Sequence, residues 1–426
     1  MEKEKRPNVL VIITHDTGRH LGCYGRKVET PNLNRLADEG VIFTNFFCTA
    51  PQCSPSRASL LTGRYPHNHG LIGLTHRGFS LNMDEPLLPT LLADAGYLTC
   101  LFGFQHESSN PYSLGYQKVF KARSNSCLYV TPLVLDFLAK KPKKPFFIMV
   151  GFSETHRPFP EYDDPVEDIE GFPYLPDIED VRRDVASLNI LVRRVDEKVG
   201  EILRAVEDAG LRDETLIVFT TDHGVAFPGA KATLFDPGIE ISMLMRGPGG
   251  FEGGKRIDAL LSNLDFAPTI LDLCGISIPM KMQGRSMLPV IRGEADKLHE
   301  WIFVEQTYHA AYDPIRGVRT ERFKYIRSFE KRPFWFPPNV DGGLSKEVAR
   351  RLGYFNRARP SEMLFDLHAD PIERKNLVND PRYADVLEKT RAILEDWMTR
   401  TADPLLKGYV PPPPSARVTP PDSYTP

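Results

Sequence analysis

The chain has 426 residues and a formal net charge of −3, with 53 Lys and Arg against 56 Asp and Glu. This balance gives no reason to expect a nucleic acid or an anionic membrane surface as a partner. With 41% hydrophobic and 26% charged residues, the composition is that of an ordinary globular protein. The length favours one large domain with a smaller second lobe.

The first residues of the chain and the spacing of its cysteines indicate in which cellular compartment the protein is expected. The first apolar run, residues 9–13, is too short for the apolar core of a secretion signal, and no later run reaches transmembrane length. We therefore expect a cytoplasmic protein. The six cysteines show neither a dense disulfide pattern nor the paired spacing of a zinc site. We expect them to be mostly reduced, Cys53 apart.

The N-terminal part of the chain is predicted to form strand, helix and strand. Residues 8–14 are a β-branched run without alternation, which is typical of a strand buried on both faces of a parallel sheet. Residues 31–40 predict a helix with Pro at its start and Gly at its end, before a strand-like run at 41–47. Cys53 then opens the predicted first turn of another helix.

The middle of the chain continues this rhythm and indicates a doubly wound α/β sheet. The expected helices are 86–95, 184–210 and 265–274, and the expected strands are 97–102, 145–152, 215–221 and 241–246. Residues 158–180 are rich in proline and acidic residues, which suits a surface excursion over the site.

From Trp301 the pattern changes to short strands separated by turns. Strands at 301–306, 315–320 and 323–327, followed by a helix at 381–400, predict a small antiparallel sheet beside the main domain. After Asp403 the chain is proline-rich, which is typical of an extended surface segment. The predicted division is therefore a catalytic α/β domain at 1–300, an α+β subdomain at 301–403 and a tail at 404–426.

Two predicted strands end in similar polar residues. The strand 8–14 is followed by His15-Asp16, and the strand 215–221 by Asp222-His223. Because the carboxyl ends of parallel strands meet at one edge of a sheet, these four side chains are expected to converge. Two carboxylates and two imidazoles are common ligands of divalent metals. The sequence therefore predicts a metal site at this edge.

The stretch around Cys53 predicts a site for chemistry on an anion. At a helix N-terminus a nucleophile faces backbone N–H groups and the positive end of the helix dipole, and Arg57 follows one turn later. The order Cys53-Ser-Pro-Ser-Arg57, then Thr62-Gly63-Arg64, resembles the type I sulfatases of the alkaline phosphatase superfamily. Taken alone, a cysteine beside an arginine is weak support, because free cysteines are usually buried hydrophobes.

The resemblance extends from Pro7 to Leu377 and leaves out the tail. Within the family the chain is most similar to the N-sulfoglucosamine sulfohydrolase (heparan N-sulfatase) subgroup, through the segments 52–63, 152–157, 216–224, 264–272 and 284–289. It implies an alkaline-phosphatase-like α/β fold with a mixed, mostly parallel sheet flanked by helices. It also implies a sulfuric ester or sulfamate hydrolase, a sulfated small molecule or saccharide as substrate, and a maturation enzyme that oxidises Cys53 to formylglycine.

The resemblance also assigns roles to single residues. Cys53 would be the formylglycine nucleophile and Arg57 would stabilise its charged hydrate. His106 would be the base for the release of sulfate, while His156 and Lys231 would lie near the leaving group. The divalent metal would be bound by the strand-end residues together with the nucleophile, and these are His15, Asp16, Cys53, Asp222 and His223.

Three positions depart from the family pattern. His15 stands where the family has the first residue of an acidic pair, and His223 stands where it usually has Asn. The family resemblance implies Ca²⁺, but two imidazoles shift the preference toward Mn²⁺, Zn²⁺ or Fe²⁺. Phe104 replaces a lysine that would contact sulfate, so either a cation from elsewhere substitutes or the substrate differs.

Other histidines and other functions stay open at this point. His20, His67, His69 and His309 either line the pocket or are ordinary polar groups, and His309 in the second lobe is the better candidate for substrate contact. The leading hypothesis is a sulfohydrolase acting on N-sulfoglucosamine or another sulfated amino sugar. A phosphonate or phosphate ester hydrolase with the same nucleophile is the second, because relatives of that class also have Asp-His at 222–223. A non-catalytic sugar or anion binder is the third.

Overall fold

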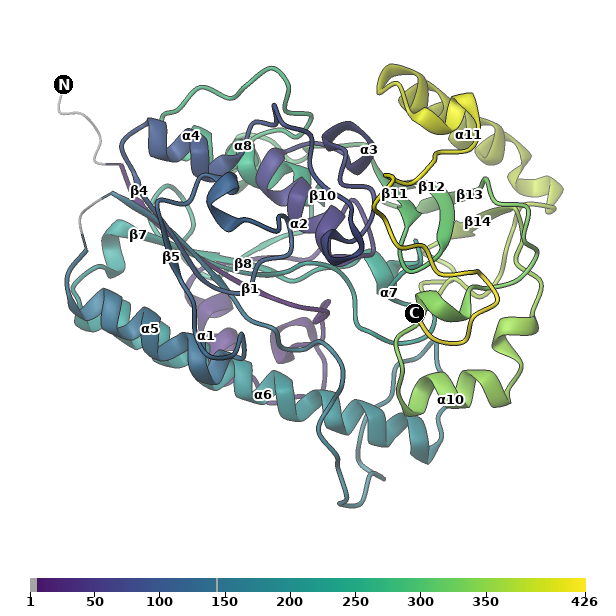
Figure 1. Ribbon diagram of the computed structural model, residues 1–426, viewed down its shortest axis with the longest axis horizontal. Coiled ribbons are helices and arrows are strands. Elements are labelled where there is room, and N and C mark those ends of the chain that lie inside the picture. Colours follow the sequence, from purple (N-terminus) through teal and green to yellow (C-terminus); the bar gives the residue numbers. More distant parts are fainter. Residues whose placement is uncertain (1–5, 143–144) are drawn as a thin grey trace.

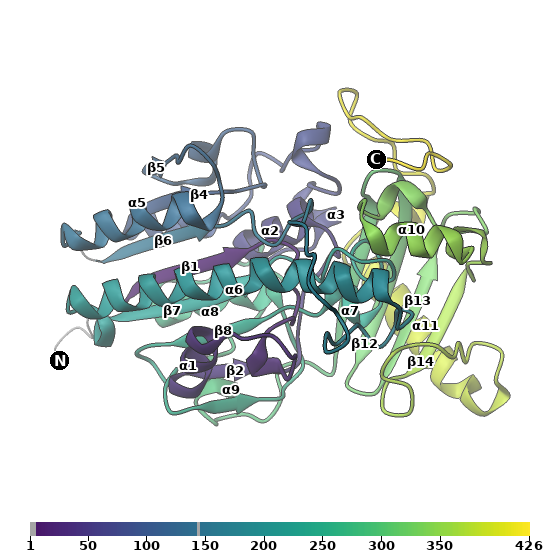
Figure 2. The same cartoon turned by 90° about the horizontal axis from the view of Figure 1, so that it is seen from below.

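The larger of two lobes is built on an eight-stranded sheet. The computed structural model describes residues 6–142 and 145–426. The strand order is β5-β4-β6-β1-β7-β8-β2-β9, and β8 is antiparallel to both of its neighbours. The strands are β1 (Asn8–Thr14), β2 (Val41–Phe43), β4 (Leu98–Gly103), β5 (Lys118–Phe120), β6 (Phe146–Gly151), β7 (Thr215–Thr221), β8 (Met243–Arg246) and β9 (Lys255–Ile257). Figure 2 shows the strands from β5 to β2 in this order.

Helices cover both faces of this sheet (Figure 1). On one face lie α1 (Pro31–Glu39), α5 (Cys127–Ala139) and α6 (Glu179–Asp208), and on the other α2 (Cys53–Thr62), α4 (Leu88–Asp94) and α8 (Phe266–Leu273). The central strand β1 is buried along its whole length, since both faces are covered. The prediction of a mixed, mostly parallel sheet with buried central strands is therefore confirmed.

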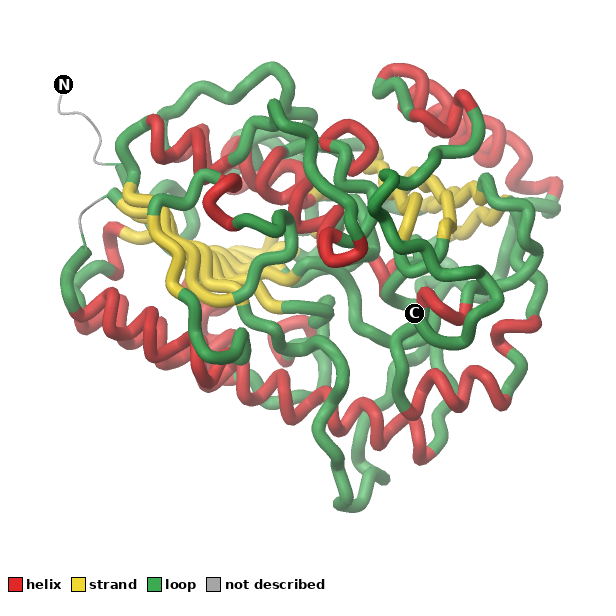
Figure 3. Tube along the Cα trace, in the orientation of Figure 1, coloured by secondary structure: helices red, strands yellow, loops and turns green. Residues whose placement is uncertain are grey.

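The smaller lobe contains a four-stranded antiparallel sheet, separate from the first in Figure 3. Its strands are β11 (Trp301–Tyr308), β12 (Tyr312–Thr320), β13 (Phe323–Ser328) and β14 (Glu362–Asp366). The helix α11 (Ala384–Arg400) packs on it, and Trp397 stacks on Phe303 with ring centroids 4.7 Å apart. This is the predicted antiparallel subdomain. The exact division at residues 300 and 403 stays a prediction.

Several local expectations differ from the structure. The run 41–47 is two strands, β2 and β3 (Phe46–Phe47), and β3 pairs with β10 (Leu261–Ser262). The prediction did not include α5, β5, β9, β14 or α10 (Leu344–Arg351). In α5 the apolar residues lie on all sides and Pro132 sits inside the helix, so neither periodicity nor composition indicates it. The short helices α3 (Pro66–His69), α7 (Asp236–Ile239) and α9 (Leu288–Ile291) complete the fold.

No helix in residues 6–142 and 145–426 combines the length and apolar character needed to cross a membrane. All six cysteines lie in these residues, and none of them forms a disulfide there.

A buried ion cluster joins the two lobes. Asp236, the first residue of α7, lies 3.0 Å from the guanidinium of Arg319 and also contacts the Lys324 ammonium, both from the smaller sheet. We predict that Asp236→Ala lowers the free energy of unfolding by about 3–5 kcal/mol, because it leaves two buried cations without their shared carboxylate. The thermal unfolding midpoint measures this effect. A midpoint equal to that of the parent protein would contradict it.

Candidate active site

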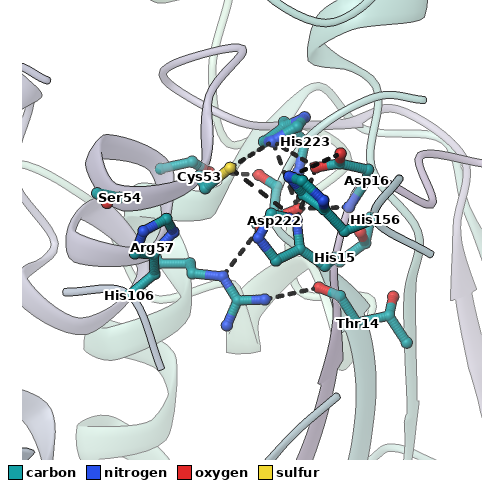
Figure 4. Close-up of polar contacts among 12 residues, drawn as sticks. Thr14, His15, Asp16, Cys53, Ser54, Arg57, His106, His156, Asp222 and His223 are labelled. Atoms are coloured by element: carbon teal, nitrogen blue, oxygen red, sulfur yellow. Dashed lines mark hydrogen bonds and ion pairs between the residues drawn. The ribbon is translucent and has the colours of Figure 1, made fainter. Parts of the chain in front are cut away.

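The strand ends meet as the sequence predicts. β1 and β7 are parallel neighbours, with Thr14 paired to Thr221, so His15-Asp16 and Asp222-His223 leave the sheet side by side. Figure 4 shows these side chains pointing toward one another. The Asp16 backbone N–H donates to Asp222 Oδ1 at 2.9 Å, which ties the two loops together.

The side chains of these four residues and of Cys53 form one buried cluster. His15 Nδ1 lies 2.7 Å from Asp16 Oδ1 and 3.5 Å from Asp222 Oδ2. His223 Nε2 lies 3.0 Å from Asp16 Oδ1 and 3.3 Å from Cys53 Sγ. One ligand atom from each of the five residues can be chosen so that all lie within 4.8 Å of one another. The two carboxylates, two imidazoles and one thiol fit a divalent metal, because these are the donor types that such ions take.

The backbone of these loops is shaped for this convergence. Asp16 has φ of 56°, a left-handed conformation that a residue with a side chain seldom adopts. Beyond His223, a Cβ added to Gly224 would lie 1.8 Å from the carbonyl oxygen of Pro237. Only glycine therefore lets the chain pass this point, and the requirement is invisible in a single sequence.

Cys53 is the first residue of α2, as predicted, and the helix is buried throughout. Arg57, one turn later, donates from Nε to Asp222 Oδ2 at 2.9 Å and from Nη2 to the Thr14 carbonyl at 2.9 Å. The arginine thus joins α2 to both strand ends. Ser56 adds a hydrogen bond from its hydroxyl to the Asp222 carbonyl oxygen.

The charges around Cys53 favour an anion. Burial alone would raise the pKa of its thiol, but the positive charges of His15, Lys231 and His223 hold that pKa well below the usual value. Lys231 Nζ lies 2.7 Å from Asp16 Oδ2 and 2.8 Å from Asp341 Oδ2. Burial would lower the pKa of Lys231, but these two carboxylates raise it well above its ordinary value, so the ammonium stays charged.

The remaining predicted residues lie around this centre. The ring of His156 is 4.6 Å from that of His15, and its side chain is 41% exposed, so it borders the solvent. The ring of His106 is 6.1 Å from that of His15. Phe104 lies under the Arg57 guanidinium, whose carbon is 5.0 Å from the ring centroid. An aromatic ring therefore occupies the place of the missing lysine. Arg57 and Lys231 are the lysine or arginine side chains that pair with the carboxylates of the described cluster.

The structure gives different surroundings to the four histidines whose roles the sequence left open. His309 is buried in the smaller lobe, and burial together with the charge of Lys231 lowers its pKa to about 4. His67 of α3 bonds Glu305 of β11 through Nδ1 at 2.7 Å, and His69 of α3 contacts Ser59 Oγ of α2 at 3.2 Å, so the two histidines tie α3 to β11 and to α2. His20 bonds Asn189 of α6 through Nε2 at 2.6 Å.

Two residues at the site were missed by the sequence prediction. Asp341 comes from a loop of the smaller lobe, where no strand end or motif marks it. His76, in the short 3₁₀ turn Thr75–Arg77, has its Nδ1 2.8 Å from His106 Nε2. Neither position had a signal in a single sequence, because each depends on a contact between distant segments.

His20 gives a prediction for the pH dependence of stability. Burial lowers its pKa from 6.5 to about 4, so the folded protein holds the imidazole neutral. The contribution of neutral His20 to the free energy of unfolding is complete above pH 6.5. It is lost as the pH falls toward 4, at roughly 1 kcal/mol per pH unit, because the unfolded chain takes up a proton that the folded protein excludes. We predict that His20→Gln, which cannot take up a proton, loses less stability than the parent protein between pH 7 and pH 4.5. Thermal midpoints across this range measure it, and parallel curves would contradict it.

Comparisons with known proteins identify the family of the chain. The sulfatase family model matches residues 7–276, and the model of the C-terminal part of N-sulphoglucosamine sulphohydrolase matches residues 227–336. Human (Homo sapiens) N-sulphoglucosamine sulphohydrolase is 31% identical over 465 residues, covering 93% of this chain and 91% of that protein. An ulvan-active sulfatase from Formosa agariphila is 29% identical over 469 residues, covering 94% of this chain and 76% of that protein.

The fold has solved counterparts as well. The structure of a 2-O GAG sulfatase superposes with a TM-score of 0.76 at 24% identity, covering 99% of this chain and 98% of that one. The sulfatase model spans well over half of the chain, and the human relative matches nearly all of it. The chain therefore belongs to the sulfatase family.

Proposed function

We propose that this protein is a sulfohydrolase that releases sulfate from a sulfated amino sugar, with Cys53 converted to formylglycine as its nucleophile. The observation that carries the proposal is the position of Cys53. It opens a buried helix, its Sγ lies 3.3 Å from His223 Nε2 and 3.9 Å from His15 Nδ1, and two carboxylates lie in the same cluster. This arrangement brings a nucleophile, a metal-binding donor set and cationic groups to one point.

A divalent metal fits the cluster beside the nucleophile. His15, Asp16, Asp222 and His223 would hold it, next to the side chain of residue 53. When bound, such an ion withdraws charge from sulfate oxygens and favours the ionised nucleophile. The family resemblance favours Ca²⁺, whereas the two imidazole donors favour Mn²⁺, Zn²⁺ or Fe²⁺.

The chain's own cations would orient the substrate. Arg57 is fixed by Asp222 and the Thr14 carbonyl, and Lys231 by Asp16 and Asp341, so both charges are held in place before an anion arrives. Such preorganised groups need little rearrangement to stabilise developing negative charge. His156, on the solvent side, is placed to give a proton to the leaving atom, and His106 to take one from the nucleophile.

The substrate class rests on the relatives. One is named N-sulphoglucosamine sulphohydrolase and another ulvan-active sulfatase. The agreement of residues 227–336 with the C-terminal part of the first supports a sulfated amino sugar. His309 and Asp341, from the smaller lobe, are the side chains that would contact the sugar. A formylglycine-generating maturation enzyme is the partner that the proposal requires.

A phosphonate or phosphate ester hydrolase is the second candidate. It is favoured by His223, whose imidazole replaces an oxygen ligand, and by Phe104, which removes a cationic contact to sulfate. A protein that binds a sulfated sugar without turnover is the third.

A substrate panel separates these functions. The protein, coexpressed with a maturation enzyme and analysed for metal content, is given N-sulfoglucosamine, an O-sulfated amino sugar and a phosphonate monoester. Sulfate release from the amino sugars supports the proposal, and N-sulfate cleavage supports the narrower substrate. Turnover of the phosphonate alone supports the second candidate. Binding without turnover by protein whose residue 53 is fully converted supports the third.

A further inference from the structure

The loop after α3 places a second histidine, His76, beside His106. His76 lies in the 3₁₀ turn Thr75–Arg77, and its Nδ1 is 2.8 Å from His106 Nε2. The two rings are nearly parallel, with centroids 5.0 Å apart and an interplanar angle of 11°. This contact joins residues 30 positions apart in the chain, on the side of the site where His106 lies in Figure 4.

The same turn also holds the backbone on both sides of this pair. Thr75 Oγ1 donates to the carbonyl oxygen of His106 at 2.9 Å. The Thr75 backbone N–H donates to Ser54 Oγ at 3.1 Å, and Ser54 follows the nucleophile directly. One turn is thus bonded to the nucleophile helix and to the loop of His106, which sets their relative position.

The proline-rich tail supports the turn from outside. The Arg417 backbone N–H donates to the Arg77 carbonyl at 2.8 Å, and Arg77 Nη1 donates to Thr419 Oγ1 at 3.1 Å. Arg417 Nη2 donates to the His76 carbonyl at 3.3 Å. At Gly78 an added Cβ would lie 2.7 Å from the Ser415 carbonyl oxygen, so the tail packs closely here. The segment expected to lie extended on the surface therefore contacts the turn that carries His76.

The direction of the hydrogen bond between the rings determines which nitrogen of His106 is free to accept a proton. In a neutral imidazole one nitrogen donates and the other accepts. If His106 Nε2–H donates to His76 Nδ1, then His106 Nδ1 is the bare nitrogen that accepts a proton. His106 Nδ1 is buried and has no hydrogen-bond partner among the described residues, as a nitrogen reserved for substrate or nucleophile would be.

We propose that His76 is the positioning residue of His106: it accepts the proton of His106 Nε2–H, leaves Nδ1 as the proton acceptor, and is itself held by the tail segment 415–419. The inference rests on the proposed function, in which His106 takes a proton during sulfate release. In this role His76 acts through His106, which its ring contacts directly, and not on the nucleophile or the metal-binding cluster.

The choice of replacement makes the test specific. Asn places its amide oxygen near the position of the histidine Nδ1, whereas Gln places its amide near that of Nε2. Since His76 uses Nδ1, His76→Asn should keep the acceptor, and His76→Ala and His76→Gln should lose it. His368, exposed on the smaller lobe, provides the matched control His368→Ala.

Two measurements on the full-length protein test the proposal. The first is kcat and KM for sulfate release. We expect His76→Ala and His76→Gln to lower kcat about 10- to 100-fold with a smaller change in KM, and His76→Asn to restore most of it. The second, which needs no turnover, is the rate at which diethyl pyrocarbonate modifies His106, followed by peptide mass spectrometry. The rate should rise in the Ala and Gln variants and return toward the parent value in His76→Asn.

The outcomes distinguish this inference from the proposed function. A His76→Ala protein with parental kcat and parental labelling of His106, or identical losses in all three variants, would overturn the positioning role. A parent protein that releases no sulfate would refute the proposed function, while the labelling rates would still report whether His76 restrains His106. Arg77→Ala, which removes a contact to Thr419, should increase labelling less than His76→Ala. Unchanged labelling there would exclude the tail from the inference.

Discussion

The Asp16→Ala and Asp222→Ala variants are each expected to lose bound divalent metal and to release sulfate at least about 10²- to 10³-fold more slowly. Each aspartate lies in the buried donor cluster, and each also pairs with a cation, Asp16 with Lys231 and Asp222 with Arg57. Removing one carboxylate therefore takes away a ligand and leaves a positive charge that repels the ion. Metal per protein chain, measured by inductively coupled plasma mass spectrometry after dialysis, is the direct readout.

A control separates loss of metal from loss of fold. Asp196 is a buried carboxylate of α6 that accepts hydrogen bonds from the backbone N–H groups of Asn32 and Leu33, far from the cluster. Asp196→Ala should lower the thermal midpoint while keeping the metal. Stoichiometric metal in both Asp16→Ala and Asp222→Ala would refute the site, and equal metal loss in Asp196→Ala would point to unfolding instead.

The parts of the fold that the sequence predicts are those determined by local patterns. The run 8–14 is apolar on both faces, so it has to be a covered central strand, and the helix 184–210 shows a regular apolar stripe. A mixed sheet was expected, but neither the identity of its antiparallel strand, β8, nor the helix α10 was predicted. Strand direction within a mixed sheet depends on how loops fold back, and α10 lies in a loop between two strands of the smaller sheet. Such features follow from tertiary packing and not from periodicity.

The site residues also divide into those that a local pattern predicts and those that depend on contacts between distant segments. His15, Asp16, Asp222 and His223 were brought together by one rule, that parallel strands end at one edge, and the structure places them so. The sequence did not predict the positions of Asp341, His76 and the tail, because each reaches the site region from a loop whose path no local pattern determines. Their roles depend on single contacts, such as the 2.8 Å between Lys231 Nζ and Asp341 Oδ2.

Residue 53 is the second position at which a large effect is expected. Cys53→Ala should lower sulfate release by roughly 10⁴-fold or more, since it removes the nucleophile of a covalent mechanism. Protein produced with a maturation enzyme should show formylglycine in the peptide that spans residue 53, and activity should rise in proportion to the converted fraction. Peptide mass spectrometry together with sulfate release measures both quantities on the same sample.

The cysteine-containing protein is the informative comparison for this prediction. Its thiol lies in the same cluster, where the positive charges of His15, Lys231 and His223 hold its pKa well below the usual value against the effect of burial. A thiolate that attacked sulfur would have to release sulfate by a route other than return to an aldehyde. We therefore expect unconverted protein to keep its fold and its metal but not to turn over. Full activity in protein whose residue 53 is entirely cysteine would refute the formylglycine mechanism, even if the metal site and the substrate class were both correct.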